Sequence, residues 1–372
     1  MPEKIIKTLC RYARAHGHAH LRLEKKGDHL LCVCGLGQTS EYLHLDRKTE
    51  HNITETFRRL VGAADNDLFS DKRFKIADNK QPISGRATLL PYDQGEKLFI
   101  TLSTEKPALR RLSALGLNRE QQALIKTNLK KKSGLIIIAG GPEEGASSTY
   151  YSLLSIIASS GDRSIYSLED YPVLENKGVN TINLRKYSDP KTAIEKVNHL
   201  DSEVIGIDAA LQVDDIKALW QSARSGRLII ATLPVASAAL AVKLLRQSGL
   251  SAADIASQII FISAQKLFKR PCPRCLHIFD PGLEIKKKIN KRWPAANLCW
   301  PKKLFYNRGC SLCQKTNRES KTAVFEIMRF WPDGRLQDGY EAMIKDALDK
   351  TGLGLINIEE IANWAMQTTK KI

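Results

Sequence analysis

Apolar positions in the middle of the chain form short continuous runs separated by segments of helical length. The runs are Leu135–Ala139, Val204–Ile207 and Leu228–Leu233, and the segments 190–200 and 213–224 lie between them. Continuous β-branched runs predict strands that are buried on both faces, and strands alternating with helices are typical of a mostly parallel, doubly wound sheet. We therefore expect an α/β core over residues 113–270.

The N-terminal part has a different pattern. Ile5–His16 is predicted to be a helix, whereas Leu21–Leu23, Leu30–Val33 and Lys97–Leu102 are predicted to be strands. Pro107 then interrupts the pattern. We expect a small α/β domain over residues 1–105 and a linker over residues 106–112.

The last part of the chain divides by composition. Residues 271–325 are basic and carry paired cysteines, which predicts a metal-binding subdomain, and residues 326–372 are predicted to be a C-terminal helical segment. The whole chain of 372 residues is 43% hydrophobic and 26% charged. This composition is that of a globular protein of two or three domains, and it excludes collagen-like, low-complexity and disulfide-rich classes.

Positive charge is concentrated in one segment. The chain carries a formal net charge of +17, and residues 264–322 hold 15 Lys/Arg against 3 Asp/Glu. A basic patch attracts nucleic acid or an anionic lipid leaflet, although a solvated face is the alternative. No RNP, helix-turn-helix or basic-zipper pattern accompanies the patch, which disfavours nucleic acid.

No segment has the pattern of a membrane anchor. The N-terminus lacks an apolar signal region, and the longest apolar stretch, Leu228–Val242, is interrupted by polar residues and proline. A spanning helix needs about 20 apolar residues. We expect a cytoplasmic protein.

A glycine-rich turn connects the first core strand to the next helix. The segment 140–147, Gly-Gly-Pro-Glu-Glu-Gly-Ala-Ser, has the spacing of a Walker A phosphate loop. Ser147 stands where a Mg²⁺-binding hydroxyl would be, but Ala146 replaces the phosphate-contacting lysine. Glu143 and Glu144 add negative charge that opposes anion binding. Taken alone, the segment is more typical of an ordinary strand-to-helix turn.

Two cysteine pairs have the spacing of a metal site. Cys272 and Cys275 form one C-x₂-C pair, and Cys310 and Cys313 form another. Two such knuckles make one tetrahedral four-cysteine site for zinc. All four positions of that site are filled by protein, so we expect a structural Zn²⁺ ion. Two unrelated cysteine pairs are the alternative.

Several segments in order resemble one family. They resemble the Walker A, aspartate-box, Walker B and histidine-box segments of the ATPases of type II secretion and type IV pilus assembly, and they comprise Gly134–Leu154, Leu168–Asp170, Asp201–Ile205 and Gly226–Pro234. The resemblance runs from about Ala77 to Phe330. It implies a RecA-like P-loop NTPase core, a small α/β (PAS-like) N-terminal domain and a zinc-binding insertion with four cysteine ligands. It also implies hexameric assembly.

Four positions depart from the family pattern. Ala146 replaces the Walker A lysine, Ala209 replaces the Walker B glutamate, and Arg227 and Pro234 replace two histidines. Four separate losses indicate that catalysis is not maintained, so we expect no catalytic residue, and ATP with Mg²⁺ has weak support as a ligand. The aspartate-box acids Glu169 and Asp170 are retained.

Other family positions outline a vestigial nucleotide site. These are Gly140, Gly145, Ser147 and Ser148 of the loop, with Arg73 and Arg86 of the N-terminal domain. The resemblance implies that such arginines approach nucleotide, and interdomain salt bridges are the competing explanation. Asp208 is a weak substitute for the Walker B acid, because neighbouring strand residues face opposite sides.

The expected function is that of a catalytically degenerate, pseudo-ATPase subunit of the secretion or pilus machinery, held peripherally at the inner membrane. Expected partners are an active secretion or pilus ATPase, an inner-membrane platform or adaptor protein, an anionic membrane surface through 264–322, and a homo- or mixed hexamer. The chain is expected to lack the family's first N-terminal domain. One alternative is an active, atypical ATPase that uses Arg227 or Lys132. A zinc-ribbon nucleic-acid-binding module is the other.

Overall fold

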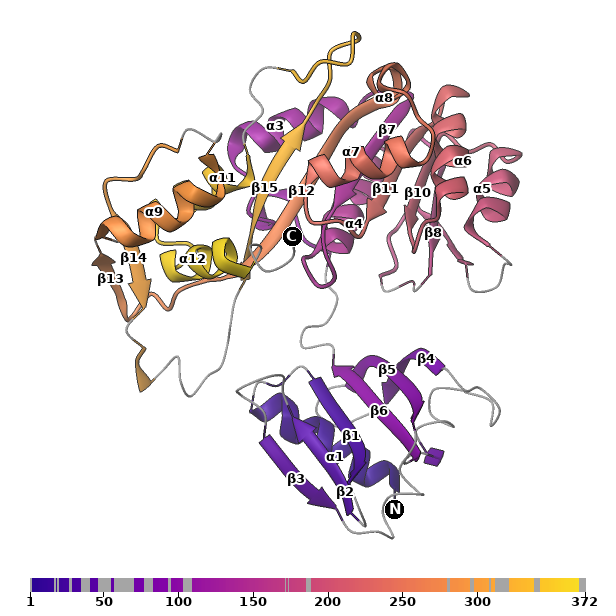
Figure 1. Cartoon of the computed structure of the whole chain (residues 1–372). Helices are drawn as coiled ribbons and strands as arrows, with labels where there is room; N and C mark the ends of the chain where they lie inside the picture. Colours follow the sequence, from indigo (N-terminus) through magenta and orange to yellow (C-terminus); the bar gives the residue numbers. More distant parts are fainter. Residues whose placement is uncertain are drawn as a thin grey trace. The chain divides into compact units, whose positions relative to one another are not determined.

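The chain folds into two compact units, Met1–Pro107 and Ala108–Ile372, in the computed structural model (Figure 1). The structure describes residues 2–16, 18, 20–26, 29–34, 41–45, 55–56, 70–76, 83–92, 95–102, 109–170, 172, 174–184, 189–279, 282–294, 298–307, 309–311, 321–337 and 342–367.

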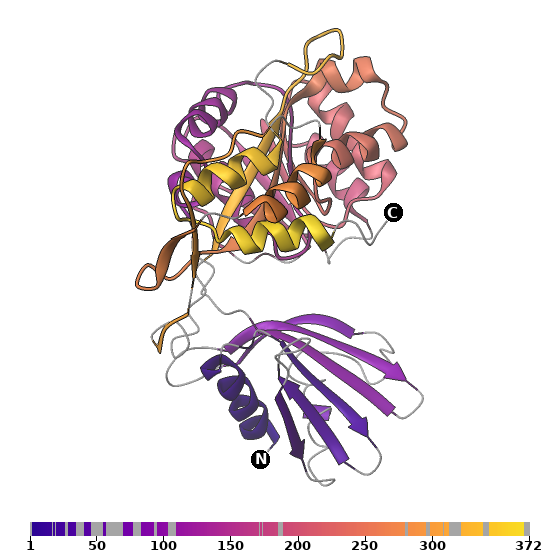
Figure 2. The ribbon, with the colours of Figure 1, turned by 60° about the vertical axis from the view of Figure 1, so that its left-hand side comes forward.

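The first unit is a six-stranded antiparallel sheet in the order β3-β2-β1-β6-β5-β4, with helix α1 packed on it (Figure 2). Its elements are α1 (Pro2–Ala15), β1 (His20–Lys26), β2 (His29–Cys34), β3 (Glu41–Leu45), β4 (Ser70–Ile76), β5 (Ile83–Tyr92) and β6 (Gly95–Leu102). Helix α1 buries Ile6, Leu9 and Cys10 against alternate residues of the strands, such as Leu21 and Leu23. The predicted helix and strands of this part are confirmed.

The second unit is built on a seven-stranded sheet in the order β15-β12-β7-β11-β10-β8-β9. Its strands are β7 (Gly134–Ala139), β8 (Ile165–Glu169), β9 (Asn180–Asn183), β10 (Val204–Asp208), β11 (Leu228–Leu233), β12 (Ile259–Lys269) and β15 (Lys321–Met328). All neighbouring strands are parallel except β12 and β15. The mostly parallel sheet expected from the apolar runs is confirmed.

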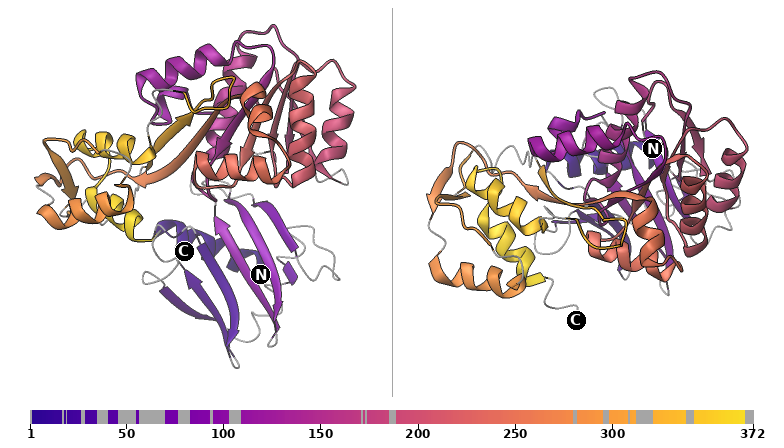
Figure 3. Two further views of the ribbon diagram at one scale, coloured as in Figure 1. Left: turned by 45° about the horizontal axis from the view of Figure 1, so that its top comes forward. Right: turned by 90° about the horizontal axis from the view of Figure 1, so that it is seen from above.

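Helices cover both faces of this sheet (Figure 3). One face carries η2 (Leu112–Ala114), α3 (Arg119–Asn128) and α4 (Ala146–Ala158), and the other carries α5 (Pro190–Asn198), α6 (Val213–Arg224), α7 (Ala238–Gln247), α8 (Ala252–Gln258) and α11 (Met343–Gly352). Strand β7 lies between the two layers: Leu135 and Ile137 contribute to one core cluster, and Ile136 and Ile138 contribute to the other. This alternation requires an apolar residue at every position of β7, as observed.

The cysteine-bearing region shares the core of the second unit. It comprises the antiparallel pair β13 (Leu276–Phe279) and β14 (Leu304–Asn307), helix α9 (Gly282–Arg292) and the later helix α12 (Ile358–Gln367). The Trp364 ring of α12 packs against Trp293 and against Phe268 of β12, with ring centroids 4.6 Å and 5.6 Å apart. Strand β15 crosses the boundary expected at residue 325, and the detailed domain division remains a prediction. None of the described helices is long and apolar enough to cross a membrane.

Side chains of α11 satisfy backbone groups of the edge strand β15. The Asp346 carboxylate accepts from the Phe325 amide at 2.7 Å, and the Lys350 ammonium donates to the Ala323 carbonyl at 2.8 Å and to Asp346 at 2.5 Å. Burial raises the pKa of Asp346 and lowers the pKa of Lys350. Desolvation of the two charges thus outweighs their mutual attraction.

A buried acid of β15, Glu326, joins two helices. The Glu326 carboxylate accepts from the Ala238 amide at 2.7 Å and from the Met343 amide at 3.2 Å. These amides belong to the first turns of α7 and α11. A carboxylate at a helix N-terminus satisfies donors that have no partner within the helix and complements the helix dipole.

Candidate phosphate loop and metal centre

The loop 140–147 lies where the sequence predicts it, between the carboxyl end of β7 and the N-terminus of α4. Gly145 is the N-cap of α4 with φ 82°, a conformation that glycine adopts without steric cost. It provides no side-chain cap, and no described residue accepts a hydrogen bond from the amides of Gly145, Ala146 or Ser147. The first turn of α4 therefore retains the backbone donors that a phosphate loop uses.

Strand β12 holds the loop from the side. The Gln265 amide group donates to the Glu144 carbonyl at 2.7 Å and accepts from the Thr149 hydroxyl at 2.6 Å. The Glu144 carboxylate contacts the Lys266 ammonium at 2.6 Å and accepts from the Leu267 amide. These contacts, which we call the Glu144 clamp, join the loop to the strand that lies next to β7 in the sheet.

The two loop acids differ in their surroundings. Glu143 is exposed and has φ 64°, which places a non-glycine residue in the left-handed region at a cost of about 1 kcal/mol. Glu144 is held by the clamp, with 21% of its side chain exposed. Ala146 is the first residue of α4, so a side chain longer than its methyl group would extend from the helix N-terminus beside the loop.

Glu169, predicted to be an aspartate-box acid, is buried in a network of hydroxyl groups. Its carboxylate accepts from the Ser167 hydroxyl at 2.5 Å and from the Tyr151 hydroxyl. Ser167 has one hydroxyl proton, which it donates to Glu169, so the Tyr150 hydroxyl at 2.6 Å must donate to Ser167. Burial, followed by the nearby Glu169 charge, raises the pKa of Tyr150 well above its usual range. Both Glu169 oxygens are thus engaged with hydroxyl donors inside the protein.

The remaining acids at this edge also bind neighbouring protein groups. The Asp170 carboxylate accepts from the Ala210 amide at 3.0 Å and so fixes the chain just after Ala209. The Asp208 carboxylate accepts from the Thr232 hydroxyl of β11 at 2.7 Å. Asp170 and Asp208 lie at the carboxyl ends of adjacent parallel strands, the edge from which the loop also leaves β7.

Arg227 and Pro234, the two residues predicted to replace family histidines, lie at opposite edges of the sheet. Pro234 is exposed and follows β11 at the loop edge. Arg227 precedes β11, where its guanidinium donates to the Ser202 hydroxyl at 3.1 Å and to the Asn198 carbonyl at 2.6 Å. Lys132 precedes β7 at that same far edge. Within one chain, neither Arg227 nor Lys132 is brought to the loop.

The two arginines predicted in the N-terminal unit occupy paired positions of neighbouring strands. Arg73 of β4 pairs directly with Arg86 of β5 in the antiparallel register. Arg86 is exposed, whereas its strand neighbours Ala87 and Gly85 are buried.

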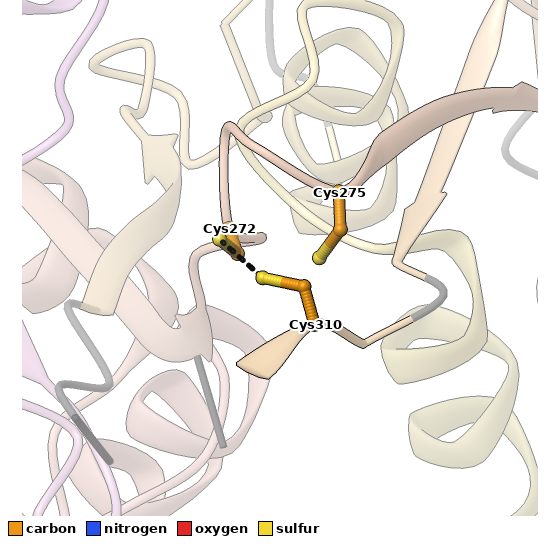
Figure 4. Close-up of side chains that lie close together, drawn as sticks. All are labelled: Cys272, Cys275 and Cys310. Carbon is orange, nitrogen blue, oxygen red and sulfur yellow. Dashed lines mark hydrogen bonds between the residues drawn. The ribbon is translucent and has the colours of Figure 1, made fainter. Parts of the chain in front are cut away.

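Three of the four predicted metal ligands converge (Figure 4). The Sγ atoms of Cys272, Cys275 and Cys310 all lie within 4.8 Å of one another, with 4.0 Å between Cys272 and Cys310. Two thiolates on one tetrahedral zinc ion lie about 3.8 Å apart, whereas disulfide-bonded sulfurs lie about 2 Å apart. The spacing therefore fits a shared metal ion, and zinc suits an all-thiolate donor set.

The fourth predicted ligand, Cys313, lies outside the described residues. Cys299, which lies between the two pairs in the sequence, is exposed and is not part of the cluster. The turn from Cys272 to Cys275 is closed by a hydrogen bond from the Cys275 amide to the Cys272 carbonyl at 3.3 Å. This turn brings both thiols of the first pair to one side, as Figure 4 shows.

The sequence predictions did not identify the clamp residues Gln265 and Lys266 or the Tyr151 partner of Glu169. Gln265 is 121 residues from Glu144, its partner in the clamp. No local motif marks such a contact, because it arises only when β12 is placed beside β7. The adjacent tyrosines following the loop were visible in the sequence, but their pairing with Glu169 depends on the packing of α4 over β8.

Comparisons with known proteins agree on one family. Residues 56–347 match the sequence profile described as Type II/IV secretion system protein. The type IV pilus assembly ATPase PilB of Acinetobacter baylyi is 24% identical over 315 residues, which cover 78% of this chain and 53% of the relative. The type II secretion system ATPase E of Vibrio cholerae is 24% identical over 321 residues, which cover 81% of this chain and 61% of the relative. The chain thus spans a little over half the length of these curated relatives.

Solved structures show the same fold. The Legionella pneumophila ATPase DotB has a TM-score of 0.65 at 13% identity, with 98% of this chain and 95% of the other covered. The pilus retraction motor PilT, solved with bound ADP, has a TM-score of 0.59 at 15% identity, with 99% of this chain and 98% of the other covered. Because the profile match extends over most of the sequence and includes the loop, the aspartate box and the three converging cysteines, the chain belongs to the Type II/IV secretion system protein family.

Proposed function

We propose that this protein is a pseudo-ATPase: a subunit of a type II secretion or type IV pilus machine that keeps the architecture of the motor core without hydrolysing ATP. The observation that carries the proposal is the loop itself. Its backbone donors are retained, but Ala146 supplies no charge for phosphate, and the cation in contact with the loop, Lys266, is paired with Glu144. A polyphosphate would meet two acids and no unpaired lysine in this segment.

The surrounding acids support the proposal. Hydrolysis requires an acid or a bound metal that can act on the attacking water. Glu169 is buried and accepts from two hydroxyl groups, and Asp208 accepts from Thr232. Ala209 offers no acid at the position after β10.

A second candidate function is that of an active, atypical ATPase, and the names of the relatives favour it. The Acinetobacter and Vibrio relatives are both named as ATPases. In that case a cation from another copy of the chain would have to complete the loop, since Arg227 and Lys132 lie at the far edge of their own sheet.

The role of the protein in an assembly follows from the family. We propose that it joins a homo-hexamer or a mixed hexamer with an active secretion or pilus ATPase, on the cytoplasmic side of an inner membrane with a platform or adaptor protein. The basic residues of 264–322 would then face anionic lipid. The arginine pair Arg73 and Arg86 would supply positive charge to a neighbouring site. A structural Zn²⁺ ion would be held by Cys272, Cys275, Cys310 and Cys313.

Calorimetric titration of the full chain with Mg-ATP tests the proposal, with turnover measured on the same sample. We expect no turnover and no binding tighter than the millimolar range. The Ala146→Lys variant restores the missing charge at the first residue of α4, and we expect it to bind Mg-ATP measurably. Turnover by the native chain that is lost in Glu169→Ala would establish the active-ATPase alternative instead.

A further inference from the structure

The Glu144 carboxylate is the anion that binds the cation and the backbone amide beside the loop. It holds the Lys266 ammonium at 2.6 Å and also accepts from the Leu267 amide, so one side chain neutralises the adjacent cation and binds the adjacent backbone. A charge-assisted hydrogen bond of this kind is about twice as strong as a neutral one. The loop is therefore held in place by the chain's own carboxylate.

The clamp closes tightly around the glycine that precedes α4. A Cβ atom on Gly145 would lie 3.1 Å from the Gln265 side-chain nitrogen and 3.4 Å from Leu267 Cδ1. Gln265 is itself buried and is fixed on its other side by Thr149 of α4. The loop is thus attached to β12 through Glu144, and the first turn of α4 is attached to β12 through Thr149.

The charged pair can still be reached from solvent. The Lys266 side chain is 28% exposed and that of Glu144 is 21% exposed. A dissolved anion can therefore compete with the carboxylate for the ammonium, which a fully buried pair would prevent.

We propose that the Glu144 clamp is an autoinhibitory contact: Glu144 occupies Lys266, the basic residue of β12 that is ion-paired with the loop, and so keeps the loop closed against phosphate. This inference rests on the proposed function and deepens it. When Glu144 loses its charge, Lys266 supplies the cation that Ala146 does not. The ligand class is a polyphosphate, whether free or part of a nucleotide.

Glu143 provides a matched control. It is the neighbouring acid in the same loop, and it is exposed and outside the clamp. Glu143→Gln and Glu144→Gln remove the same charge from adjacent positions, but only Glu144→Gln frees the charge of Lys266. The double variant Glu144→Gln/Lys266→Met removes the freed cation again.

The test is calorimetric titration of each full-length variant with inorganic tripolyphosphate. We expect Glu144→Gln to bind about tenfold more tightly than the native chain, the gain of one charge-assisted hydrogen bond. Glu143→Gln should gain less than about threefold from charge removal alone. The double variant should return to the native affinity.

Hydrogen exchange gives a readout that does not depend on ligand. The hydrogen-bonded amides of Ser148, Thr149 and Leu267 should exchange faster in Glu144→Gln than in Glu143→Gln, because only the first variant weakens the attachment of the loop to β12. Equal affinity gains in the two single variants, a gain that persists in the double variant, unchanged exchange, or no binding by any variant would each overturn the inference. Turnover by the native chain would instead overturn the proposed function, whatever the variants show.

Discussion

The hydroxyl of Tyr150 lies where the side chain of residue 206 would begin: a Cβ atom on Gly206 would be 2.4 Å from the Tyr150 oxygen. Tyr150 belongs to α4 and is fully buried, and its hydroxyl is hydrogen-bonded to Ser167 of β8. Helix α4 therefore approaches β10 as closely as it does because position 206 carries no side chain. That approach also brings Tyr151 to Glu169.

Substitution of Gly206 by alanine should destabilise the second unit. The added methyl group would press on the Tyr150 ring and on Leu154, and overpacking of this kind costs about 1–3 kcal/mol. Urea denaturation followed by circular dichroism measures the loss. The double variant Gly206→Ala/Tyr150→Phe removes the colliding oxygen and should recover part of the stability; an alanine variant as stable as the native chain would show that the contact is not tight.

Each chain should bind one zinc ion through the converging cysteines. Cys275→Ser should lower the zinc content measured by atomic absorption from about one ion per chain to near zero, because a structural site needs four ligands. Cys313→Ser should do the same if it is the fourth ligand. Cys299→Ser is the control, since Cys299 is exposed and outside the cluster. Cobalt substitution should give the absorption bands of a tetrahedral thiolate site.

The buried pair of α11 should show strong coupling. Lys350→Met leaves the Asp346 carboxylate buried without its cation, a loss of about 3–5 kcal/mol in unfolding free energy. The double variant Asp346→Asn/Lys350→Met leaves no uncompensated charge and should be more stable than Lys350→Met alone. A double-mutant cycle by guanidinium denaturation gives the coupling. Simple additivity of the two substitutions would contradict the buried ion pair.

The same pair should affect stability in opposite directions at the two ends of the pH range. Burial raises the pKa of Asp346 above 3.8. The contribution of Asp346 to the free energy of unfolding is therefore present below pH 3.8 and is lost as the pH rises through the raised pKa. Burial lowers the pKa of Lys350 below 10.5. The contribution of Lys350 to the free energy of unfolding is therefore present above pH 10.5 and is lost as the pH falls through the lowered pKa. The free energy of unfolding of the native chain minus that of the double variant should therefore be smaller at pH 7 than at pH 3 or pH 11.

Glu326 should be one of the more sensitive buried positions. It joins the first turns of α7 and α11, and in Glu326→Gln the amide nitrogen would face a backbone donor, at a cost of about 1.5–3 kcal/mol. Glu203→Gln is a matched control, because Glu203 is exposed and accepts from a single backbone amide, that of Ser164, at 3.0 Å. Equal losses of stability by thermal denaturation in the two variants would contradict the bridging role.

The strands of the core could be predicted because burial on both faces leaves a continuous signal. Leu135–Ala139 shows this most clearly: β7 begins one residue before this apolar run and ends with it at Ala139. The helix expected after the glycine-rich turn begins at Ala146, directly after the left-handed Gly145. Strand β12 was not predicted, since Gln265 and Lys266 interrupt its apolar run.

The candidate sites also include parts that could be predicted from the sequence and parts that could not. The cysteine pairs were predictable because metal ligands recur at short, fixed spacing, and Cys272 and Cys275 lie on one turn. The surroundings of Glu169 were not, since its partners come from α4 and from its own strand only after packing. The clamp could not be predicted either, because the sequence shows Glu144 only as a negative charge that would repel phosphate.

Strand β12 contacts the loop through Gln265–Leu267, ends at Lys269, and leads directly to Cys272. Cys272 follows Leu267 by five positions, at most about 17 Å of extended chain. The strand is paired with β15 as far as Lys269, so this tether is stiff over its first part. The cysteine cluster thus lies just beyond the C-terminal end of the strand that holds the loop. Removal of a metal ion bound there should loosen the contact between Glu144 and β12.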